Sequence, residues 1–360
     1  MRAEAARVLV VRRDNIGDLV CTTPLFTALR RKFPDAWIGA LVNSYNAAVL
    51  ERNPDLDEVV VYSKLKHLDP GESAAAALWR RLRDFWRLRR RSLDYLFLAT
   101  PEFVPRSLGV ARALGPKCVV GFSDGSAAAR RLDLSLPLSQ VGAMHEVERV
   151  FALGAHLGLS EPIPALKVVP HPRALRQATE AFARHSGLRV GVQISTRRPN
   201  QRWPTERFAE LIGRLHALGA VCMLLWSPGA ADHPRHPGDD DKAMAIARKV
   251  SDARLIAYRA GPLGELIGAL AACDVVVTPD GGAMHLAAAV GIPVVGIFGP
   301  TNDTATSPLA RSGVRTEVLT NPVWCRPCML RECPIDHRCM TGIEPARVRE
   351  AVDRIARVIA

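Results

Sequence analysis

The sequence predicts an α/β protein made of two domains, each built on a parallel sheet. Short apolar segments recur through all 360 residues, and helical stretches separate them. Alternation of this kind is typical of parallel strands joined by crossover helices. The chain is long enough to form two cores, and the proline-rich stretch from Glu161 to Pro172 is the expected linker. Residues 1–165 and 173–342 are therefore the predicted domains.

The expected strands follow one another in both halves. Those of the first half are Arg7–Arg12, Trp37–Val42, Glu58–Tyr62, Tyr95–Ala99 and Cys118–Phe122. Those of the second half are Arg189–Ser195, Val221–Ser227, Arg254–Tyr258, Asp274–Thr278, Val294–Phe298 and Arg315–Leu319. Residues 343–360 have apolar side chains at helical spacing. This last helix is expected to pack back on the first domain.

Composition and charge limit the class of protein. The formal net charge is +12, and 48% of the residues are hydrophobic. No apolar run reaches the roughly eighteen residues that a membrane-spanning helix needs. The apolar core of the first residues is too short for a signal peptide, so a cytoplasmic protein is expected. The basic excess favours an anionic membrane surface or nucleic acid as partner.

The densest basic cluster runs from Trp79 to Arg91 (WRRLRDFWRLRRR). On a helix, one side gathers Leu82, Phe85, Trp86 and Leu88, while the arginines spread over the rest. This pattern is typical of a helix that lies on an anionic membrane surface. The alternative is a domain helix with a solvated basic face. No motif of a nucleic-acid-binding module accompanies the charge, so no nucleic-acid partner is expected.

The segment from Asp274 to Asn302 predicts a ligand site at a strand end. A buried strand stops before Asp280, Gly281 and Gly282, and an alanine-rich helix follows. Ligands bind at such carboxyl ends of parallel strands. The free N–H groups and the dipole of a helix N-terminus favour a phosphate, to which His285 could also donate. The alternative is an ordinary strand–helix turn capped by Asp280.

The first strand ends in a comparable polar loop. The loop offers Asp14, Asn15, Gly17 and Asp18. A carboxylate at the mouth of a sheet, such as that of Asp18, can act as general base on a hydroxyl. The alternative is that Asp18 only caps the following turn. Thr23 before Pro24 predicts the start of a helix.

A basic loop follows the first strand of the second half. Its hydroxyl and guanidinium groups can bind a diphosphate, and the candidates are Ser195, Thr196, Arg198 and Arg202. A solvated basic loop is the alternative. Nothing in the sequence resembles the pair of carboxylates that holds a divalent ion in many sugar-nucleotide enzymes. Chemistry without a metal is therefore expected.

Four cysteines fall within fifteen residues, spaced C-x2-C-x4-C-x5-C. They are Cys325, Cys328, Cys333 and Cys339. Such a cluster can bind zinc or an iron–sulfur cluster, but its two pairs lie closer together than in common zinc modules. Reduced buried thiols or a local disulfide are the alternatives. No metal is expected, and the four thiols remain a candidate cluster.

Five motifs are informative because of their order along the chain. They are Arg13–Asp18 with Thr23-Pro24 and Phe33-Pro34, Arg202–Phe208, Asp280–Leu286, Phe298–Thr301 and the cysteine-rich stretch Cys325–Cys339. In this order and spacing they resemble glycosyltransferase family 9, the heptosyltransferases that build the inner core of lipopolysaccharide. The resemblance covers nearly the whole chain. It implies two facing Rossmann-like domains of the GT-B type.

The resemblance also implies an inverting, metal-independent transfer of heptose from ADP-heptose, with no cofactor besides this donor. The first domain would bind the acceptor, a lipopolysaccharide core sugar at the cytoplasmic face of the inner membrane, and Asp18 would deprotonate it. The second domain would cradle the nucleotide with Asp280, Gly281, Gly282 and His285. The family places a ribose-binding carboxylate where Asp232 is the nearest match. Where this chain has Gln201, family members often have lysine, and Arg198 and Arg202 would substitute for it.

Two other classes of function stay open. The same fold could use another nucleotide-sugar or a protein acceptor. A non-catalytic protein could use its basic face to bind anionic lipid or nucleic acid, but it would not need the carboxylate of Asp18. NAD-dependent redox chemistry is disfavoured, because no G-x-G-x-x-G follows the first strand.

Overall fold

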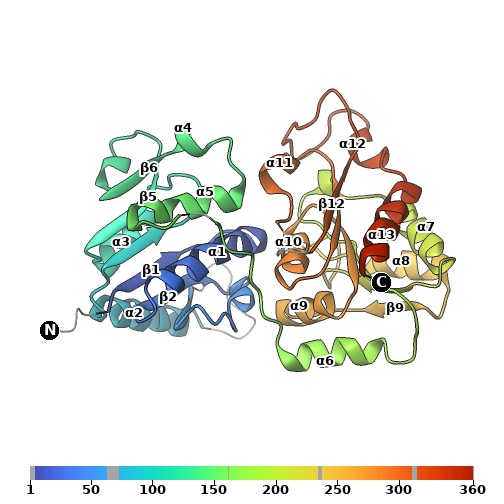
Figure 1. Ribbon diagram of the computed structural model, residues 1–360, viewed down its shortest axis with the longest axis horizontal. Coiled ribbons are helices and arrows are strands. Elements are labelled where there is room, and N and C mark those ends of the chain that lie inside the picture. The colour runs from blue at the N-terminus through green and yellow to red at the C-terminus, as the bar shows by residue number, and fades with distance from the viewer. Residues whose placement is uncertain (1–4, 63–72, 161, 234–236, 310–313, 360) are drawn as a thin grey trace. The chain divides into compact units, whose positions relative to one another are not determined.

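A computed structural model describes residues 5–62, 73–160, 162–233, 237–309 and 314–359. The chain forms two compact units, Met1–Lys167 and Val168–Ala360. Each unit contains one six-stranded sheet in which all neighbouring strands are parallel (Figure 1). The predicted α/β class is confirmed. The boundary between the units falls inside the predicted linker, of which Glu161 lies outside the described residues.

The sheet of the first unit has the strand order β3-β2-β1-β4-β5-β6. Its strands are β1 (Arg7–Val11), β2 (Trp37–Asn43), β3 (Glu58–Tyr62), β4 (Tyr95–Leu98), β5 (Cys118–Ser123) and β6 (Leu134–Pro137). The α-helices are α1 (Ile16–Lys32), α2 (Ala74–Arg90), α3 (Ser107–Leu114), α4 (Leu138–Val141) and α5 (Glu146–Ala152). The five predicted strands are present. Sequence reasoning missed β6, a four-residue edge strand without a fully buried side chain.

Helix α1 begins at Ile16, so the predicted start at Thr23-Pro24 was wrong. Pro24 lies inside the helix, where it cannot donate to the carbonyl of Val20 four residues earlier. The hydroxyl of Thr23 donates to that carbonyl instead, at 2.7 Å. This bond supplies the hydrogen bond that the proline removes, which explains how the helix continues. The start at Ile16 follows from Asn15, which caps it.

The sheet of the second unit has the strand order β12-β11-β10-β7-β8-β9. Its strands are β7 (Arg189–Gln193), β8 (Val221–Leu225), β9 (Leu255–Tyr258), β10 (Val275–Pro279), β11 (Val294–Phe298) and β12 (Thr316–Thr320). The α-helices are α6 (Pro172–Ala181), α7 (Thr205–His216), α8 (Asp240–Val250), α9 (Leu263–Ala271), α10 (Gly282–Ala289), α11 (Asp303–Thr306), α12 (Arg338–Thr341) and α13 (Pro345–Ile359). All six predicted strands are found.

The last helix is present as predicted, and its expected packing on the first domain stays a prediction. Val348, Val352 and Ile355 of α13 are buried in the core of the second unit. The helix packs on α7, β10 and β11 of that unit. The apolar stripe of α13 is therefore buried within the second unit. Among the described residues, no helix is long and apolar enough to cross a membrane.

Both sheets follow one plan, and this plan determines where polar loops meet. In each sheet, the first three strands follow one another outward from the centre in one direction. The chain then returns to the centre, and the last three strands follow one another outward on the other side. The order thus reverses between β1 and β4, and again between β7 and β10. Ligands of open α/β sheets bind at the carboxyl ends of the strands that flank such a reversal. The loops after these four strands are therefore the expected ligand-binding places.

Candidate functional site

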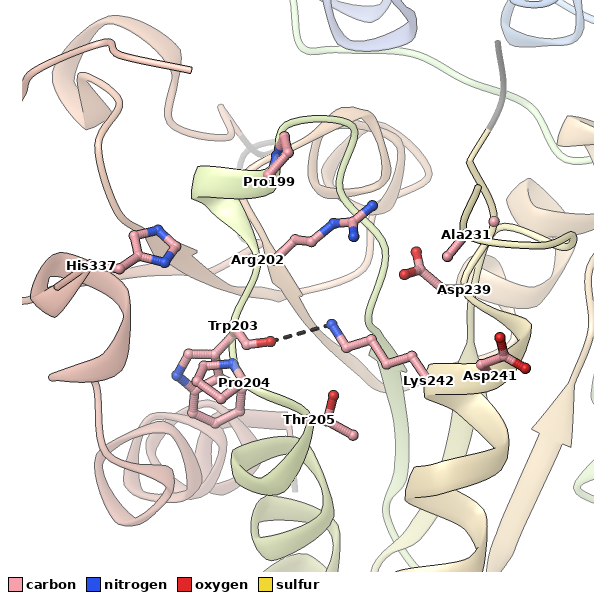
Figure 2. Close-up of a pocket in the computed structure, with 11 residues that line it drawn as sticks. Pro199, Arg202, Trp203, Pro204, Thr205, Ala231, Asp239, Asp241, Lys242 and His337 are labelled. Carbon is pink, nitrogen blue, oxygen red and sulfur yellow. Dashed lines mark hydrogen bonds between the residues drawn. The ribbon is translucent and has the colours of Figure 1, made fainter. Parts of the chain in front are cut away.

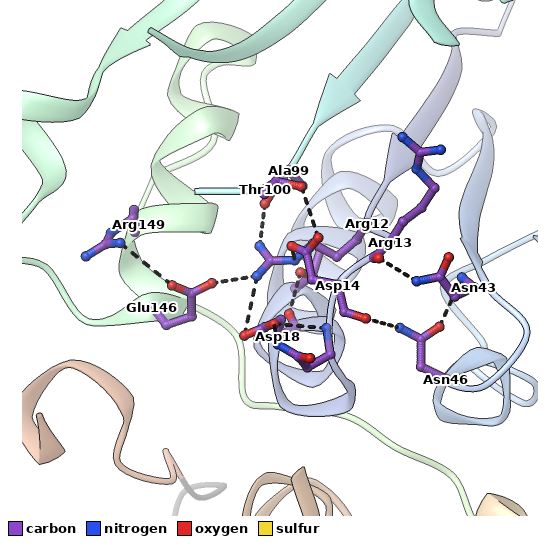
Figure 3. Close-up of polar contacts among 12 residues, drawn as sticks. Arg12, Arg13, Asp14, Asp18, Asn43, Asn46, Ala99, Thr100, Glu146 and Arg149 are labelled. Atoms are coloured by element: carbon purple, nitrogen blue, oxygen red, sulfur yellow. Dashed lines mark hydrogen bonds and ion pairs between the residues drawn. The ribbon is translucent and has the colours of Figure 1, made fainter. Parts of the chain in front are cut away.

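In the first unit, a buried arginine gathers three carboxylates beside the strand reversal (Figure 3). Arg12 directly follows β1 and is 1% exposed. Its guanidinium forms ion pairs with Asp14 at 2.9 Å and Glu146 at 2.7 Å, and lies 3.7 Å from Oδ1 of Asp18. It also donates to the carbonyl of Ala99, directly after β4. Arg12 therefore ties the loops after β1 and β4 to helix α5.

The carboxylate of Asp18 is both hydrogen-bonded within its loop and accessible from solvent. Its Oδ2 accepts hydrogen bonds from the backbone N–H (3.0 Å) and the side-chain amide (2.8 Å) of Asn15. This is the capping arrangement that the sequence left as an alternative. The side chain is still 31% exposed, so a hydroxyl from solvent can approach the carboxylate. Capping and proton acceptance are thus compatible here.

Burial and the charge of Arg12 shift the pKa values of Asp14 and Glu146 in opposite directions. Burial raises the pKa of Asp14 and of Glu146, and the nearby Arg12 only partly offsets it. Removal from water disfavours the charged form of a carboxyl. Of this cluster, sequence reasoning found the loop residues but missed Arg12 and Glu146. Glu146 lies 134 residues from Arg12 along the chain, and no short motif connects them.

In the second unit, Asp280 sits at the other strand reversal. It directly follows β10, is 7% exposed, and its Oδ2 accepts hydrogen bonds from Gln201 and Thr301, both at 2.6 Å. Burial raises the pKa of Asp280, while these bonds and the charge of Arg198 lower it to a lesser degree. The loops after β7, β10 and β11 therefore meet at one carboxylate.

The N-terminus of α10 lies next to Asp280, as the sequence predicted. Gly281 precedes the helix in extended backbone geometry. A methyl group at Gly281 would find its nearest neighbour, the carbonyl of Pro279, at 3.9 Å, an ordinary contact. The glycine is therefore not required by local packing. His285 lies in the same helix and is buried.

The loop after β7 uses its hydroxyls within the unit. Ser195 Oγ accepts from the backbone N–H of Ser227 at 2.8 Å, and Thr196 Oγ1 donates to the carbonyl of Arg198 at 3.1 Å. The side chain of Arg198 itself is exposed. Ser195 and Thr196 thus shape the loop, whereas Arg198 has a guanidinium within reach of solvent.

A pocket of about 410 Å³ opens where the loops after β7 and β8 meet α7 and α8 (Figure 2). Its charged lining residues are Arg202, Asp239, Asp241 and Lys242. Within the described residues, Nε of Arg202 is buried without a hydrogen-bond partner. Lys242 donates to the carbonyls of Ile194 and Trp203, both at 3.2 Å, and burial lowers its pKa to about 8.

In the loop after β8, Asp239 lines the pocket, whereas Asp232, the carboxylate that the sequence predicted, does not. Asp232 is exposed and does not line this pocket. Asp239 lines it and is 5% exposed. Two cations and a buried carboxylate in one pocket suit a ligand with phosphate and hydroxyl groups. Sequence reasoning missed Asp239 and Lys242, although both lie at the start of a helix that follows a buried strand.

The four clustered cysteines are free thiols. Cys339 is buried, and its pKa is raised by that burial and by the nearby thiols of the cluster. The backbone N–H of His337 donates to Sγ of Cys333 at 3.3 Å. In the part of the chain that the structure describes, no three His, Cys, Asp or Glu side chains are grouped closely enough to hold a metal ion.

Comparison with known proteins places this geometry in one family. The model of glycosyltransferase family 9 (heptosyltransferase) matches residues 81–338. Lipopolysaccharide heptosyltransferase 1 of Pseudomonas aeruginosa is 26% identical over 333 residues, which cover 91% of this chain and 87% of the relative.

Solved structures agree on the fold. The crystal structure of a family 9 glycosyltransferase from Veillonella parvula has a TM-score of 0.79 at 20% identity, covering 99% of this chain and 98% of that one. Escherichia coli heptosyltransferase WaaC with ADP-2-deoxy-2-fluoro heptose has a TM-score of 0.69 at 20% identity, covering 97% and 99%. The iron-containing dodecameric glycosyltransferase TibC from enterotoxigenic Escherichia coli has a TM-score of 0.57 at 13% identity, covering 99% and 78%.

These likenesses confirm the GT-B type of the predicted fold, and the family match spans most of the chain. This protein therefore belongs to glycosyltransferase family 9, the heptosyltransferases.

Proposed function

We propose that the protein transfers heptose from ADP-heptose to an inner-core sugar of lipopolysaccharide, with inversion at the anomeric carbon. The Pseudomonas aeruginosa relative is a lipopolysaccharide heptosyltransferase, and the WaaC structure holds an ADP-heptose analogue. Within this chain, the observation that carries the proposal is the solvent-accessible carboxylate of Asp18 at the strand reversal of the first unit.

The acceptor would bind on the first unit, on the loop that contains Asp14, Asn15 and Gly17. Asp18 takes the proton of the acceptor hydroxyl as its oxygen attacks the anomeric carbon. The new glycosidic C–O bond forms while the C–O bond to the diphosphate breaks, and ADP leaves with that electron pair. Arg12, held by Glu146 and Asp14, keeps a positive charge beside Asp18.

The donor would bind on the second unit. The N-terminus of α10, with Gly281, Gly282 and His285, faces the diphosphate, and Arg198 and Arg202 supply positive charge to the leaving group. Asp280 would fix this loop, and Ser195 and Thr196 would shape the neighbouring one. Ribose hydroxyls would bind a carboxylate of the loop after β8, either Asp232 as the resemblance implies or Asp239 in the pocket.

Transfer would require no divalent ion, because arginines and a helix N-terminus can stabilise the leaving diphosphate. The enzyme would work at the cytoplasmic face of the inner membrane, where the acceptor is exposed to a peripheral protein. The cysteine cluster takes no part in this proposal.

Calorimetry with ADP, UDP, GDP and NAD tests the donor half directly. ADP should bind in the presence of EDTA, and the other nucleotides should bind at least tenfold more weakly, as a built nucleotide pocket predicts. A transfer assay with ADP-heptose and a heptose-deficient core acceptor tests the reaction. Tight UDP binding without ADP binding would indicate another nucleotide-sugar. Transfer that stops with EDTA and returns with Mg²⁺ would contradict metal independence, and ADP binding without transfer would leave only a nucleotide-binding protein.

A further inference from the structure

Helix α2 exposes an apolar stripe that the first unit leaves uncovered. The exposed fractions of its large apolar side chains are 43% for Leu78, 69% for Trp79, 56% for Leu82 and 60% for Trp86. At these spacings the four side chains lie on one face of the helix. Tryptophan side chains bury large areas in most proteins, so two such exposed residues on one helix are unusual.

The opposite face of α2 holds the helix to the unit. Ala77 and Leu88 are buried, and the guanidinium of Arg81 lies 4.6 Å from the ring centre of Tyr62. Arg91 forms an ion pair with Glu58 at 3.1 Å, and Arg87 pairs with the same carboxylate. The sequence had grouped Leu88 and Phe85 with the outer residues. The structure instead separates an anchored face from an outward one.

Basic side chains flank the outward stripe. Arg83 is 59% exposed and forms an ion pair with the neighbouring Asp84 at 3.3 Å. The guanidinium of Arg90 lies 4.5 Å from the ring centre of Trp86, so cation and ring form one amphipathic surface. Asp84 is the single acidic residue between Ala74 and Arg90. The stripe is thus apolar, with positive charge along one side.

This combination selects one occupant. A second copy would bring two arginine-rich helices together, which is unfavourable. Nucleic acid would use the arginines but gives no reason to expose two leucines to water. An anionic bilayer accepts tryptophan and leucine at the headgroup boundary and arginine at the phosphates.

We propose that the stripe formed by Leu78, Trp79, Leu82 and Trp86 docks on an anionic lipid surface, with Arg83 and Arg90 on its headgroups. The inference deepens the proposed function and rests on it for its purpose, since a lipid-anchored acceptor is presented at such a surface. Docking itself is a binding event and is measured without the transfer reaction.

Co-sedimentation with phosphatidylcholine vesicles, with and without phosphatidylglycerol, tests the docking. The wild type should bind the phosphatidylglycerol vesicles at low salt and release them at high salt. Replacing Trp79, Leu82 and Trp86 by serine should lower the partition coefficient at least tenfold. The matched control is Trp324→Ser, since Trp324 is 84% exposed in the second unit and should not affect binding.

Charge is tested separately. Arg83→Gln with Arg90→Gln should weaken binding about twentyfold at low salt, since each arginine near an anionic surface contributes about fivefold. The control with equal charge change is Arg173→Gln with Arg176→Gln, on the exposed face of α6, which should bind as the wild type does. ADP affinity by calorimetry should be unchanged in all variants, so a failure of docking is separable from a failure of the transferase proposal.

Three outcomes would overturn the inference. The serine variant could bind phosphatidylglycerol vesicles as strongly as the wild type. Binding could be equally strong on pure phosphatidylcholine at every salt concentration. Alternatively, the serine variant could lose self-association in sedimentation velocity, or binding to an RNA duplex, without losing the vesicles. Loss of self-association would assign the stripe to a protein partner, and loss of RNA binding would assign it to a nucleic-acid partner.

Discussion

Gln201 donates a hydrogen bond of 2.6 Å to Oδ2 of Asp280, across the point where the strand order of the second sheet reverses. A lysine at this position would neutralise the carboxylate, whereas the amide of Gln201 cannot do so. Burial raises the pKa of Asp280, and its neutral partners and the charge of Arg198 offset this only in part.

Asp280→Asn should change how stability depends on pH. A carboxyl whose folded-state pKa is raised contributes stability that is fully present below its unfolded pKa and is lost as pH rises through the folded pKa. The wild type should therefore lose free energy of unfolding, relative to Asp280→Asn, as pH rises above about 4. Urea denaturation at a series of pH values measures the difference. The exposed Asp232→Asn should follow the wild-type curve, and parallel curves for wild type and Asp280→Asn would contradict the assignment.

Asp18→Asn separates capping from catalysis. The amide oxygen of asparagine can still accept from the backbone N–H of Asn15, the N-cap of α1, so the capping box should persist and α1 should keep its stability. Transfer should fall by about a hundredfold to ten-thousandfold, the usual contribution of a general base, while ADP affinity stays constant. Glu148→Gln is the matched control, since Glu148 accepts from the N–H of His145 in the capping box of α5. Near-normal turnover of Asp18→Asn would remove Asp18 from the mechanism.

Glu146→Gln should act through Arg12 as a positioning change. The glutamine oxygen can still accept from Arg12, but the guanidinium 3.7 Å from Asp18 loses one of its charged partners and is held less firmly. The kcat should fall several-fold while the ADP affinity stays constant, because the proposed donor site lies on the second unit. Transfer kinetics and calorimetry measure the two quantities. An unchanged kcat with lower thermal stability would mean that Glu146 is only structural.

Gly281→Ala should weaken ADP binding and leave the fold intact. The structure has room for the added methyl group, and the extended backbone suits alanine. The methyl would stand between a phosphate and the N-terminus of α10. ADP affinity should fall by at least tenfold, while Tm changes by less than about 2 °C. Gly282→Val enlarges the same obstacle and should weaken ADP further. Unaltered affinity in both variants would place the phosphate elsewhere.

Lys242→Met should reveal the buried amine at alkaline pH. The pKa of Lys242 is lowered to about 8, from 10.5 for an ordinary lysine, because it is buried. Between these values the unfolded chain binds more protons, so the lysine's contribution to stability rises with pH. Relative to Lys242→Met, the wild type should gain up to on the order of 3 kcal/mol between pH 8 and 10.5. Chemical denaturation at pH 7.5, 9 and 10.5 tests this gain, and a constant difference would contradict it.

The fold was predictable wherever apolar strands alternate with helices. Eleven predicted strands are present, and β6 was missed because an edge strand with half-buried side chains lacks the apolar signal. The start of α1 was wrong because the hydroxyl of Thr23 compensates for Pro24, an exchange that propensity rules do not include. The amphipathic pattern of α13 indicated a buried face without indicating its partner, which within the second unit is the core of that unit.

The candidate site was predictable in its loops and not in its partners. Sequence position placed Asp14, Asp18 and Asp280 at strand ends, where the structure has them. Arg12 with Glu146, and Gln201 with Asp280, are contacts between segments separated by 134 and 79 residues. Tertiary packing alone brings such pairs together. A single sequence contains no signal for them.

In both sheets, the strands form the rigid framework, and the segments that follow them carry the groups that would select the ligand. The sheets consist of apolar strands whose pairing is independent of any ligand, while the proposed ligand-facing groups lie in the segments that follow β1, β7, β8 and β10. A segment of this kind can be exchanged as a cassette. Grafting residues 195–202 from a relative that has lysine in place of Gln201, with Ile194 and Trp203 of the core retained, should therefore retune the choice of sugar nucleotide and leave the hydrophobic framework, and with it the folding of the chain, unaltered.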